Sequence, residues 1–333
     1  MGIEFEKRSE NMKHRWRGLR VLVTGADGFM GSHLTERLIR EGARVSIYIR
    51  GNSITGTVLY TLKNLAPLEQ TFDDILTGNI ASQDAVELIR KNKPDIIFHL
   101  AADAYVPNSF EHPREVMESN LWGTINVLEA VRKLPKTKRI VCTSSSEIYG
   151  TAQYAPIDET HPMNPSSPYA ASKAAADRTA HSYFNTYHLP ISIIRPFNTF
   201  GPRHTYDVIP KFIRLALEGK PLTVHGDGRQ SRDFTYVEDM IEGFLLMGRH
   251  PKAVGQAVNF GTGKDVSIKK TAELVKEFSK SGSPIVSIGR RASEVQRLVC
   301  DNRLAKKLFG WKPRFSFEDG LKANIEWAKE HWR

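Results

Sequence analysis

The stretch that decides the fold of this chain is Leu19-Arg-Val-Leu-Val-Thr-Gly25-Ala-Asp-Gly28-Phe-Met-Gly31. An apolar run leads into a glycine-rich turn and then into a helical pattern, which predicts a strand, a tight turn and a helix. Gly25 allows the sharp turn, Gly28 lets backbone amides approach a pyrophosphate, and Gly31 permits close packing of helix on strand. The positive end of the helix dipole then faces the phosphates. We interpret the stretch as a dinucleotide-binding turn, in preference to a glycine-rich turn that holds no ligand.

The first half of the chain alternates short apolar runs with helical patterns, which is typical of a parallel sheet with crossover helices. Strands are expected at residues 20–24, 44–48, 95–100, 139–143 and 191–195, with a further strand near 74–76. Helices are expected to begin near Phe29, Ser82, Pro113 and Pro168, and Ser166 or Ser167 is a candidate cap for the last of them. These elements predict an α/β fold with a Rossmann-like, doubly wound parallel sheet.

The second half has a different sequence pattern, because from Pro196 onward loops rich in Gly, Pro and Arg separate shorter elements. The pattern predicts a basic flexible leader at 1–17 and a dinucleotide-binding domain at 18–196 with a return segment at about 234–262. A smaller C-terminal α/β substrate lobe is expected at 197–233 and 263–333. Residues 258–261 are expected to rejoin the main sheet as an added strand, and residues 317 to about 331 to form an amphipathic helix.

The composition is that of a globular protein, since 40% of the 333 residues are apolar and 25% are charged. No apolar run is long enough to span a bilayer and no signal-peptide pattern is present, so a cytoplasmic location is expected. The two cysteines, Cys142 and Cys300, lie in apolar runs and are expected to be buried reduced thiols. The net charge of +10 suits ligands that carry phosphates, whereas no aromatic and basic platform supports nucleic-acid binding.

Tyr169 and Lys173 form the motif Tyr-x-x-x-Lys within Ser-Pro-Tyr-Ala-Ala-Ser-Lys. A spacing of four residues places both side chains on the same helix face. An ammonium one turn away favours the phenolate, so the pKa of Tyr169 is expected to be lowered toward working pH. Such a tyrosine can take the proton of a sugar or alcohol hydroxyl. The spacing alone is also common on solvated helices, but downstream of a dinucleotide turn it favours a catalytic function.

A polar stretch, Thr143-Ser144-Ser145-Ser146-Glu147-Ile148-Tyr149-Gly150, follows the expected strand that ends near Cys142. Ligands bind at the carboxyl edge of such sheets, so this stretch is expected to lie at the site. A serine hydroxyl there can hydrogen-bond a reacting oxygen, and a carboxylate can act as a base. The alternative is that the serines satisfy loop backbone groups and Glu147 is solvated. The position beside Tyr169 favours function.

The end of the second expected strand departs from the usual NAD pattern, in which an acidic residue holds the ribose diol. This chain has Tyr48-Ile49-Arg50-Gly51-Asn52-Ser53 instead. Arg50 is a candidate for binding the ribose 2′-phosphate of the cofactor, which would favour NADP over NAD. Alternatively, Arg50 faces solvent and NAD binds without an acid. Asn79 is a candidate contact for the adenine.

Further motifs follow in order: His99-Leu-Ala-Ala102, Ser145-Ser-Glu-Ile-Tyr-Gly150, Arg195-Pro-Phe-Asn-Thr-Phe-Gly-Pro-Arg203 and Gly226-Asp-Gly-Arg-Gln-Ser-Arg-Asp-Phe234. With the glycine turn and Tyr-x-x-x-Lys, they resemble the extended short-chain dehydrogenase/reductase family that acts on nucleotide sugars. The resemblance runs from about residue 20 to 327. It implies that NAD or NADP is bound by Gly25, Asp27, Gly28, Phe29, Met30, Gly31, Arg50, Asn79, Ile80, Leu100, Ala101, Ala102, Tyr169 and Lys173.

The resemblance also implies a first chemical step, in which Tyr169 deprotonates the sugar 4-hydroxyl while Ser145 hydrogen-bonds that oxygen. Lys173 would lower the pKa of the tyrosine and bind the nicotinamide ribose. Dehydratases and decarboxylases of the family carry a Glu at the position of Glu147, whereas epimerases commonly have a small residue. Glu147 therefore favours removal of the C5 proton and loss of the 6-hydroxyl as water, which gives a 4-keto-6-deoxy sugar.

Ser146 stands where dTDP-glucose dehydratases of the family carry an acidic Asp. The pattern is more similar to GDP-mannose dehydratases and to N-acetylglucosamine 4,6-dehydratases of the legionaminic acid type, so an N-acetylglucosamine nucleotide is the favoured substrate. A 4-epimerase is the alternative. A UDP-glucuronate decarboxylase needs a cation just before the catalytic tyrosine, and residues 161–168 contain no Lys or Arg. A catalytically silent member that binds RNA is a further alternative.

Substrate contacts follow from the same resemblance. The diphosphate ligands would be Asn198, Arg203, Arg232 and Arg297, with a surface ion pair as the alternative function of each arginine. Asp103, Tyr105 and His204 are candidates for facing the sugar. A homodimer is expected, because members of the family commonly pair through two helices, one of them bearing Tyr-x-x-x-Lys. No cluster has metal-ligand spacing, so no metal is expected.

Overall fold

The structure is a computed structural model that describes residues 16–50, 52–54, 57–59, 62–289 and 294–332. The leader predicted at residues 1–17 therefore lies almost entirely outside the described residues. Its last part is not a solvated tail, because the Trp16 side chain is only 3% exposed. Its ring packs against Phe98 at a centroid distance of 5.8 Å. Burial of this large aromatic surface fastens the start of the described chain to the core.

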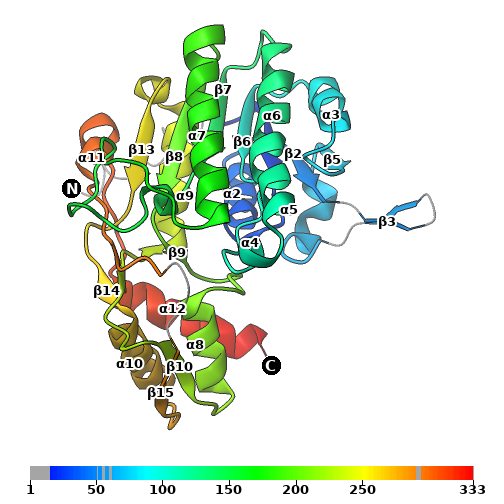
Figure 1. The fold of residues 1–333 in the computed structure, drawn as a ribbon. Helices are drawn as coiled ribbons and strands as arrows, with labels where there is room; N and C mark the ends of the chain where they lie inside the picture. Colours follow the sequence, from blue (N-terminus) through cyan, green and yellow to red (C-terminus); the bar gives the residue numbers. More distant parts are fainter. Residues whose placement is uncertain (1–15, 51, 55–56, 60–61, 290–293, 333) are drawn as a thin grey trace, which may run out of the picture.

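A seven-stranded parallel sheet forms the centre of the molecule, in the order β13-β8-β7-β6-β1-β2-β5 (Figure 1). Its strands are β1 (Arg20–Thr24), β2 (Arg44–Ile49), β5 (Asp74–Thr77), β6 (Ile96–His99), β7 (Arg139–Thr143), β8 (Ile191–Pro196) and β13 (Ala257–Phe260). The central strands are buried on both faces, as expected for a parallel sheet covered by helices. The predicted doubly wound fold and the returning strand at the sheet edge are thus confirmed.

Helices cover both faces of this sheet (Figure 1). On one face lie α3 (Asp84–Asn92), α6 (Gly123–Arg132) and α7 (Pro168–Tyr187), which pack against one another in sequence. On the other face lie α2 (Phe29–Arg40) and α9 (Val237–Arg249). The core consists of one apolar cluster on each side of the sheet and a third, smaller cluster that includes Ile148, Tyr149 and Phe197.

A smaller lobe lies beyond the carboxyl ends of the strands, at the bottom of Figure 1. Its helices α8 (Val208–Leu217), α10 (Ile268–Ser279) and α12 (Phe317–His331) pack together. Beside them run the parallel pair β10 (Leu222–His225) and β15 (Ile285–Ile288), and a small sheet of β14 (Val266–Ser267), β11 (Ser231–Arg232) and β16 (Arg297–Leu298). The two lobes therefore meet along the edge where the predicted site residues emerge.

The remaining elements are short. They are β3 (Asn52–Ile54), β4 (Thr57–Leu59), β9 (Thr199–Phe200), β12 (Thr235–Tyr236), α4 (Asn108–Glu111), α5 (Pro113–Met117), α11 (Arg303–Phe309), η1 (Ala66–Thr71), η2 (Glu118–Trp122), η3 (Ser146–Tyr149) and η4 (Pro251–Ala253). Cys142 and Cys300 are both buried and free, as predicted. Among the described residues, no helix combines the length and apolar character needed to cross a bilayer.

Candidate active site

The glycine turn between β1 and α2 has the geometry of an anion cradle. Gly25 has a φ of +68°, and a Cβ there would lie 2.8 Å from the backbone nitrogen of Ala101. A Cβ on Gly31 would lie 2.1 Å from the carbonyl oxygen of Gly25. Gly28 precedes α2 without any side-chain cap, and the first turn of α2 carries no acidic residue. The first amides of this helix are therefore available to a phosphate, so the residues present fit a dinucleotide.

Asp27, in the middle of this turn, has a structural partner that the sequence did not indicate. Its carboxylate accepts hydrogen bonds from the backbone amides of Lys63, Asn64 and Leu65 at 2.7, 2.9 and 3.0 Å. The Asn64 side chain donates in return to the Asp27 carbonyl at 2.7 Å. Asp27 thus holds the segment after β4 against the turn, and its contact with a cofactor stays a prediction.

The other predicted cofactor residues lie around the turn at different depths. The amide of Gly25 donates to the carbonyl of Tyr48 at 2.9 Å, which places the end of β2 and the exposed Arg50 beside the turn. Asn79 is also exposed, and its side-chain oxygen accepts a hydrogen bond from the amide of Ala81. Ile80 is buried under α6, where a Cβ on Gly123 would meet it at 2.8 Å. Phe29, Met30, Leu100 and Ala102 line the cavity, whereas Ala101 packs against the turn itself.

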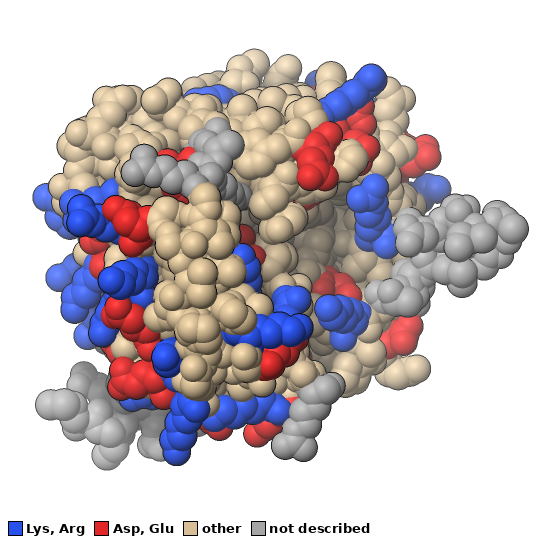
Figure 2. Space-filling model, turned by 60° about the horizontal axis from the view of Figure 1, so that its bottom comes forward, with Lys and Arg blue, Asp and Glu red and all other residues tan. Residues whose placement is uncertain are grey.

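All five predicted catalytic residues line one cavity of about 610 Å³, a volume typical of small-molecule sites. They are Ser145, Ser146, Glu147, Tyr169 and Lys173. The cavity lies between the two lobes, at the carboxyl edge of the sheet. The lower face of the molecule is hollowed near its centre, with basic and acidic side chains interspersed around it (Figure 2).

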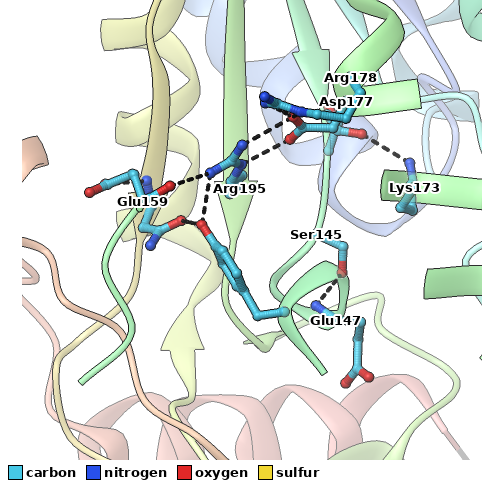
Figure 3. Close-up of polar contacts among 10 residues, drawn as sticks. Ser145, Glu147, Glu159, Lys173, Asp177, Arg178 and Arg195 are labelled. Carbon is cyan, nitrogen blue, oxygen red and sulfur yellow. Dashed lines mark hydrogen bonds and ion pairs between the residues drawn. The ribbon is translucent and has the colours of Figure 1, made fainter. Parts of the chain in front are cut away.

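The loop after β7 presents the first three of these residues. Ser145 caps η3, and its hydroxyl accepts a hydrogen bond from the amide of Glu147 at 3.2 Å. The short 3₁₀ turn then aims the Glu147 side chain away from the sheet (Figure 3). The charge of Glu147 opposes ionisation of Tyr169, which indicates that the carboxylate and the phenol share one environment.

The helix that carries the tyrosine and lysine begins as predicted. The Ser167 hydroxyl caps α7 by accepting a hydrogen bond from the amide of Ala170 at 3.1 Å, and Pro168 occupies the first turn. The Lys173 ammonium donates to the carbonyl of Thr143 at 3.0 Å, which joins α7 to the end of β7. The Lys173 ammonium is therefore held between α7 and β7.

The predicted lowering of the tyrosine pKa is wrong for this chain without ligands. Burial raises the pKa of Tyr169, and the hydrogen bond with Ser145 offsets this only in part. Burial also lowers the pKa of Lys173 to about 8, so its charge is costly to maintain. Burial is the largest cause of both shifts, and the nearby carboxylates of Glu147, Asp207 and Asp103 further oppose ionisation of Tyr169. Lowering of the tyrosine pKa would require an additional positive charge in the cavity.

Three predicted substrate residues line the same cavity. Asn198 presents a buried side-chain oxygen that has no hydrogen-bond partner within the described residues. Arg232 is held by Glu294 at 3.1 Å and by the carbonyl of Val295 at 2.7 Å. Tyr105 lines the cavity and is 45% exposed. Its ring packs edge to face with the ring of Tyr206, at a centroid distance of 5.9 Å.

Three other predicted residues do not line this cavity, and their contacts with a substrate stay predictions. Arg203 pairs with Glu36 of α2 at 2.7 Å, and it does not line the cavity. Arg297 is exposed and pairs with Asp265 at 2.8 Å, so the surface ion pair is its observed arrangement. The Asp103 carboxylate accepts hydrogen bonds from the amide of Tyr105 and the side chain of Asn108, and its charge opposes ionisation of Tyr169. The ion-pair partners of Arg203 and Arg297 lie 167 and 32 positions away, and the sequence does not reveal them.

The sequence also missed residues that the structure places at the cavity. Lys211 and Arg214 of α8 line it, as does the segment from Thr205 to Asp207. The spacing of Lys211 and Arg214 on an otherwise apolar helix was the available signal. The ring of His204, which was a candidate for facing the sugar, stacks on Phe29 of the glycine turn at 4.4 Å and thereby joins the two lobes.

A doubly wound sheet with a glycine turn, a capped Tyr-x-x-x-Lys helix and a shared cavity defines a class of dinucleotide-dependent α/β proteins. Residues 22–324 match the family model described as GDP-mannose 4,6 dehydratase. The chain belongs to this family, within the extended short-chain dehydrogenase/reductases that modify nucleotide sugars. Among the described residues, no group of three or more His, Cys, Asp or Glu side chains is arranged to hold a metal ion.

Known relatives differ in the reaction that they catalyse. A trifunctional UDP-glucose 4,6-dehydratase, 3,5-epimerase and reductase of Arabidopsis thaliana is 36% identical over 319 residues, 93% of this chain and 47% of the plant protein. This chain thus spans about half the length of that relative. A UDP-glucose 4-epimerase of Mycolicibacterium smegmatis is 32% identical over 316 residues, covering 93% of this chain and 99% of that protein. The crystal structure of DesIV, a dTDP-glucose 4,6-dehydratase from Streptomyces venezuelae with NAD and TYD bound, is similar with a TM-score of 0.85 and 28% identity, covering 94% of this chain and 98% of that one.

Proposed function

We propose that the chain is a nucleotide-sugar 4,6-dehydratase, a hydro-lyase that converts a nucleotide-linked hexose to its 4-keto-6-deoxy form. The observation that carries this proposal is the position of Glu147 in the same cavity as Ser145, Tyr169 and Lys173. A carboxylate beside the residues that oxidise C4 is what proton removal from C5 requires. We favour an N-acetylglucosamine nucleotide as the substrate, from the likeness of the sequence around Glu147.

The cofactor in this proposal is NAD or NADP. Its pyrophosphate would lie on the first amides of α2, and its nicotinamide ribose would contact Tyr169 and Lys173. When bound, the nicotinamide supplies the acceptor that takes hydride from C4 and returns it to C6. An oxidised nicotinamide bound there would also bring a positive charge, which favours the phenolate that the surroundings of Tyr169 disfavour. Titration with NAD and with NADP tests the function of Arg50, because equal or weaker binding of NADP would discard a 2′-phosphate contact.

The residues of the chain then have the following functions. Tyr169 takes the proton of the 4-hydroxyl as C4 becomes a ketone, and Ser145 hydrogen-bonds that oxygen. The ketone makes the C5 proton acidic, and Glu147 removes it. The C6–O bond breaks, and the leaving hydroxyl takes a proton from Glu147 or through Ser146 and departs as water. After hydride reaches C6 and a proton reaches C5, the net change is loss of one water with no net oxidation.

Substitution of Glu147 by Gln tests the reaction. With a panel of nucleotide sugars, the wild-type chain is expected to give a product lighter by one water. The Glu147→Gln variant is expected to lose at least about a hundredfold in this product, while reduction of the nicotinamide, followed by its absorbance, persists. Glu87→Gln, on an exposed ion pair of α3, is the matched control. Full turnover by Glu147→Gln would exclude the elimination and favour the 4-epimerase. RNA affinity that falls steeply with salt, without sugar turnover, would favour the RNA-binding alternative.

We also propose a homodimer that pairs through α7 and the adjoining η2–α6 segment. Trp122 of η2 is 56% exposed and Tyr187 at the end of α7 is 45% exposed, so apolar surface is available on these adjacent helices. Sedimentation at micromolar concentration tests the pairing, and a single species of 37.6 kDa would contradict it.

A further inference from the structure

Behind the cavity, Tyr149 links the loop that carries Glu147 to the sheet. It lies two residues after Glu147, at the end of η3, and its side chain is fully buried. Its hydroxyl donates to the side-chain oxygen of Asn259 on β13 at 2.7 Å and accepts from the guanidinium of Arg195 on β8 at 2.9 Å. The loop is therefore fastened to two strands through one phenol.

Arg195 makes a second set of contacts on the opposite side, to the helix that carries Tyr169 and Lys173. Its Nε and Nη2 donate to the two carboxylate oxygens of Asp177 at 2.8 and 3.0 Å, a bidentate arrangement. Asp177 lies one helical turn after Lys173 on α7 (Figure 3). One guanidinium thus joins the loop of the base to the helix of the tyrosine.

The charges in this network are stable near neutral pH. Burial opposes the charge of Arg195, but its hydrogen bonds and ion pair with Asp177 raise the pKa of the guanidinium. Burial likewise opposes ionisation of Asp177, and the hydrogen bond from Arg195 holds the pKa of that carboxyl below its usual range. Arg178 gives Asp177 a further partner, and the carbonyl of Glu159 accepts from Arg195 at 3.3 Å. The ion pair between Arg195 and Asp177 therefore stays charged near neutral pH.

None of Tyr149, Asp177, Arg195 and Asn259 lines the cavity. They cannot touch a substrate there, yet two of them adjoin the residues that do. We propose that Tyr149 and Arg195 are positioning residues that fix the Glu147 carboxylate relative to Tyr169, so that C4 oxidation and C5 deprotonation occur on one bound sugar. This inference rests on the proposed dehydratase function. It assigns to the network the second step of that reaction in particular. Tyr149 lies at the end of η3, two residues after Glu147, whereas Ser145, which contacts the 4-oxygen, lies at the opposite end of η3 beside β7.

Substitution of Tyr149 by Phe removes one hydroxyl and keeps the ring that packs on Phe197. The variant is expected to reduce bound nicotinamide at a rate close to that of the wild type, and to keep its KM within about twofold, because the cavity lining is intact. Exchange of the C5 proton with deuterated solvent and overall kcat are expected to fall roughly tenfold to a hundredfold, as a small misplacement of a base predicts. Tyr183→Phe is the matched control, since it removes a hydroxyl that donates to Glu129 at 2.8 Å at the far end of α7.

A second substitution tests whether the effect passes through Arg195. Arg195→Lys keeps a positive charge for Asp177 but cannot make the forked contacts. If both residues act through one contact, the double variant Tyr149→Phe/Arg195→Lys loses little more activity than either single variant, whereas Tyr149→Phe/Tyr183→Phe is additive. Equal urea midpoints for wild type and Tyr149→Phe would show that the loss of exchange does not come from unfolding.

The outcomes separate the two hypotheses. If the wild-type chain neither reduces nicotinamide nor releases water from any nucleotide sugar, the proposed function fails. If the wild type is active and Tyr149→Phe keeps full C5 exchange, the positioning inference fails while the function stands. If Tyr149→Phe slows nicotinamide reduction and C5 exchange equally, the phenol supports the whole site and is not specific to the base, which also overturns the inference.

Discussion

Substitution of Arg195 by Met measures how much the buried ion pair contributes to stability. The Arg195 side chain is 2% exposed and the Asp177 side chain is 0% exposed. Removal of the guanidinium leaves the Asp177 carboxylate in the interior with Arg178 as its remaining cation, and the Arg178 side chain is 48% exposed. Removal of one partner from a buried pair typically costs about 3–5 kcal/mol. Because Arg178 remains, we expect a loss near the lower end, about 3 kcal/mol.

The double variant Arg195→Met/Asp177→Leu separates the value of the pair from the penalty of an unpaired charge. With both charges replaced by apolar groups, no buried carboxylate is left without its partner. We expect this variant to regain about 2 kcal/mol relative to Arg195→Met, since such replacements are often close to neutral. The loss in the single variant should also shrink as the pH falls toward 5, because protonation of Asp177 removes the unpaired charge.

The assay is equilibrium urea unfolding followed by circular dichroism. For a slope of about 3 kcal/mol per molar urea, the expected loss moves the midpoint by about 1 M without changing the slope. A midpoint shift below about 0.3 M in the single variant would refute the reasoning. A double variant that is less stable than Arg195→Met would refute it as well, because the penalty would then not come from the unpaired carboxylate.

Two further predictions follow from the site. Burial lowers the pKa of Lys173 from 10.5 to about 8, so between these values the unfolded chain binds a proton that the folded chain has lost. The free energy of unfolding should therefore rise with pH across this window by up to about 3 kcal/mol, and Lys173→Met should lack the rise; equal pH slopes in urea unfolding would contradict this. Arg232→Gln should weaken the binding of a nucleoside diphosphate at least about tenfold by calorimetric titration, whereas Arg297→Gln should change it less than about twofold. If the two variants lost equal affinity for the nucleoside diphosphate, a position in the cavity lining would not identify the arginine that binds the diphosphate.

The Rossmann-like sheet could be predicted because its signals are local. The glycine turn needs Gly25 and Gly31 for contacts within one strand–turn–helix unit, and these contacts are present. The start of α7 is equally local, since a serine cap and a proline in the first turn lie within three residues. The one-turn spacing of Tyr169 and Lys173 likewise needs only the period of a helix.

The pairing of charged side chains could not be predicted in this way. Arg203 and Arg232 both follow glycines in the sequence, yet Arg203 pairs with a residue 167 positions away on α2, whereas Arg232, on β11, lines the cavity. The direction of the Tyr169 pKa shift depended on burial, to which the charges of Glu147, Asp207 and Asp103 add. Burial at one site is the sum of contributions from many segments, and no single motif encodes it.

The sequence by itself determined the order of strands and helices, the glycine turn and the residues that meet at the carboxyl edge of the sheet, because periodicity and turn chemistry act over a few residues. Only the tertiary structure decided which arginine reaches the cavity and that Asp27 holds a neighbouring segment. It alone joined Tyr149, Arg195 and Asp177 behind the site. Those contacts link residues 18 to 46 positions apart, and they exist only once the sheet and the helix on its face have packed together.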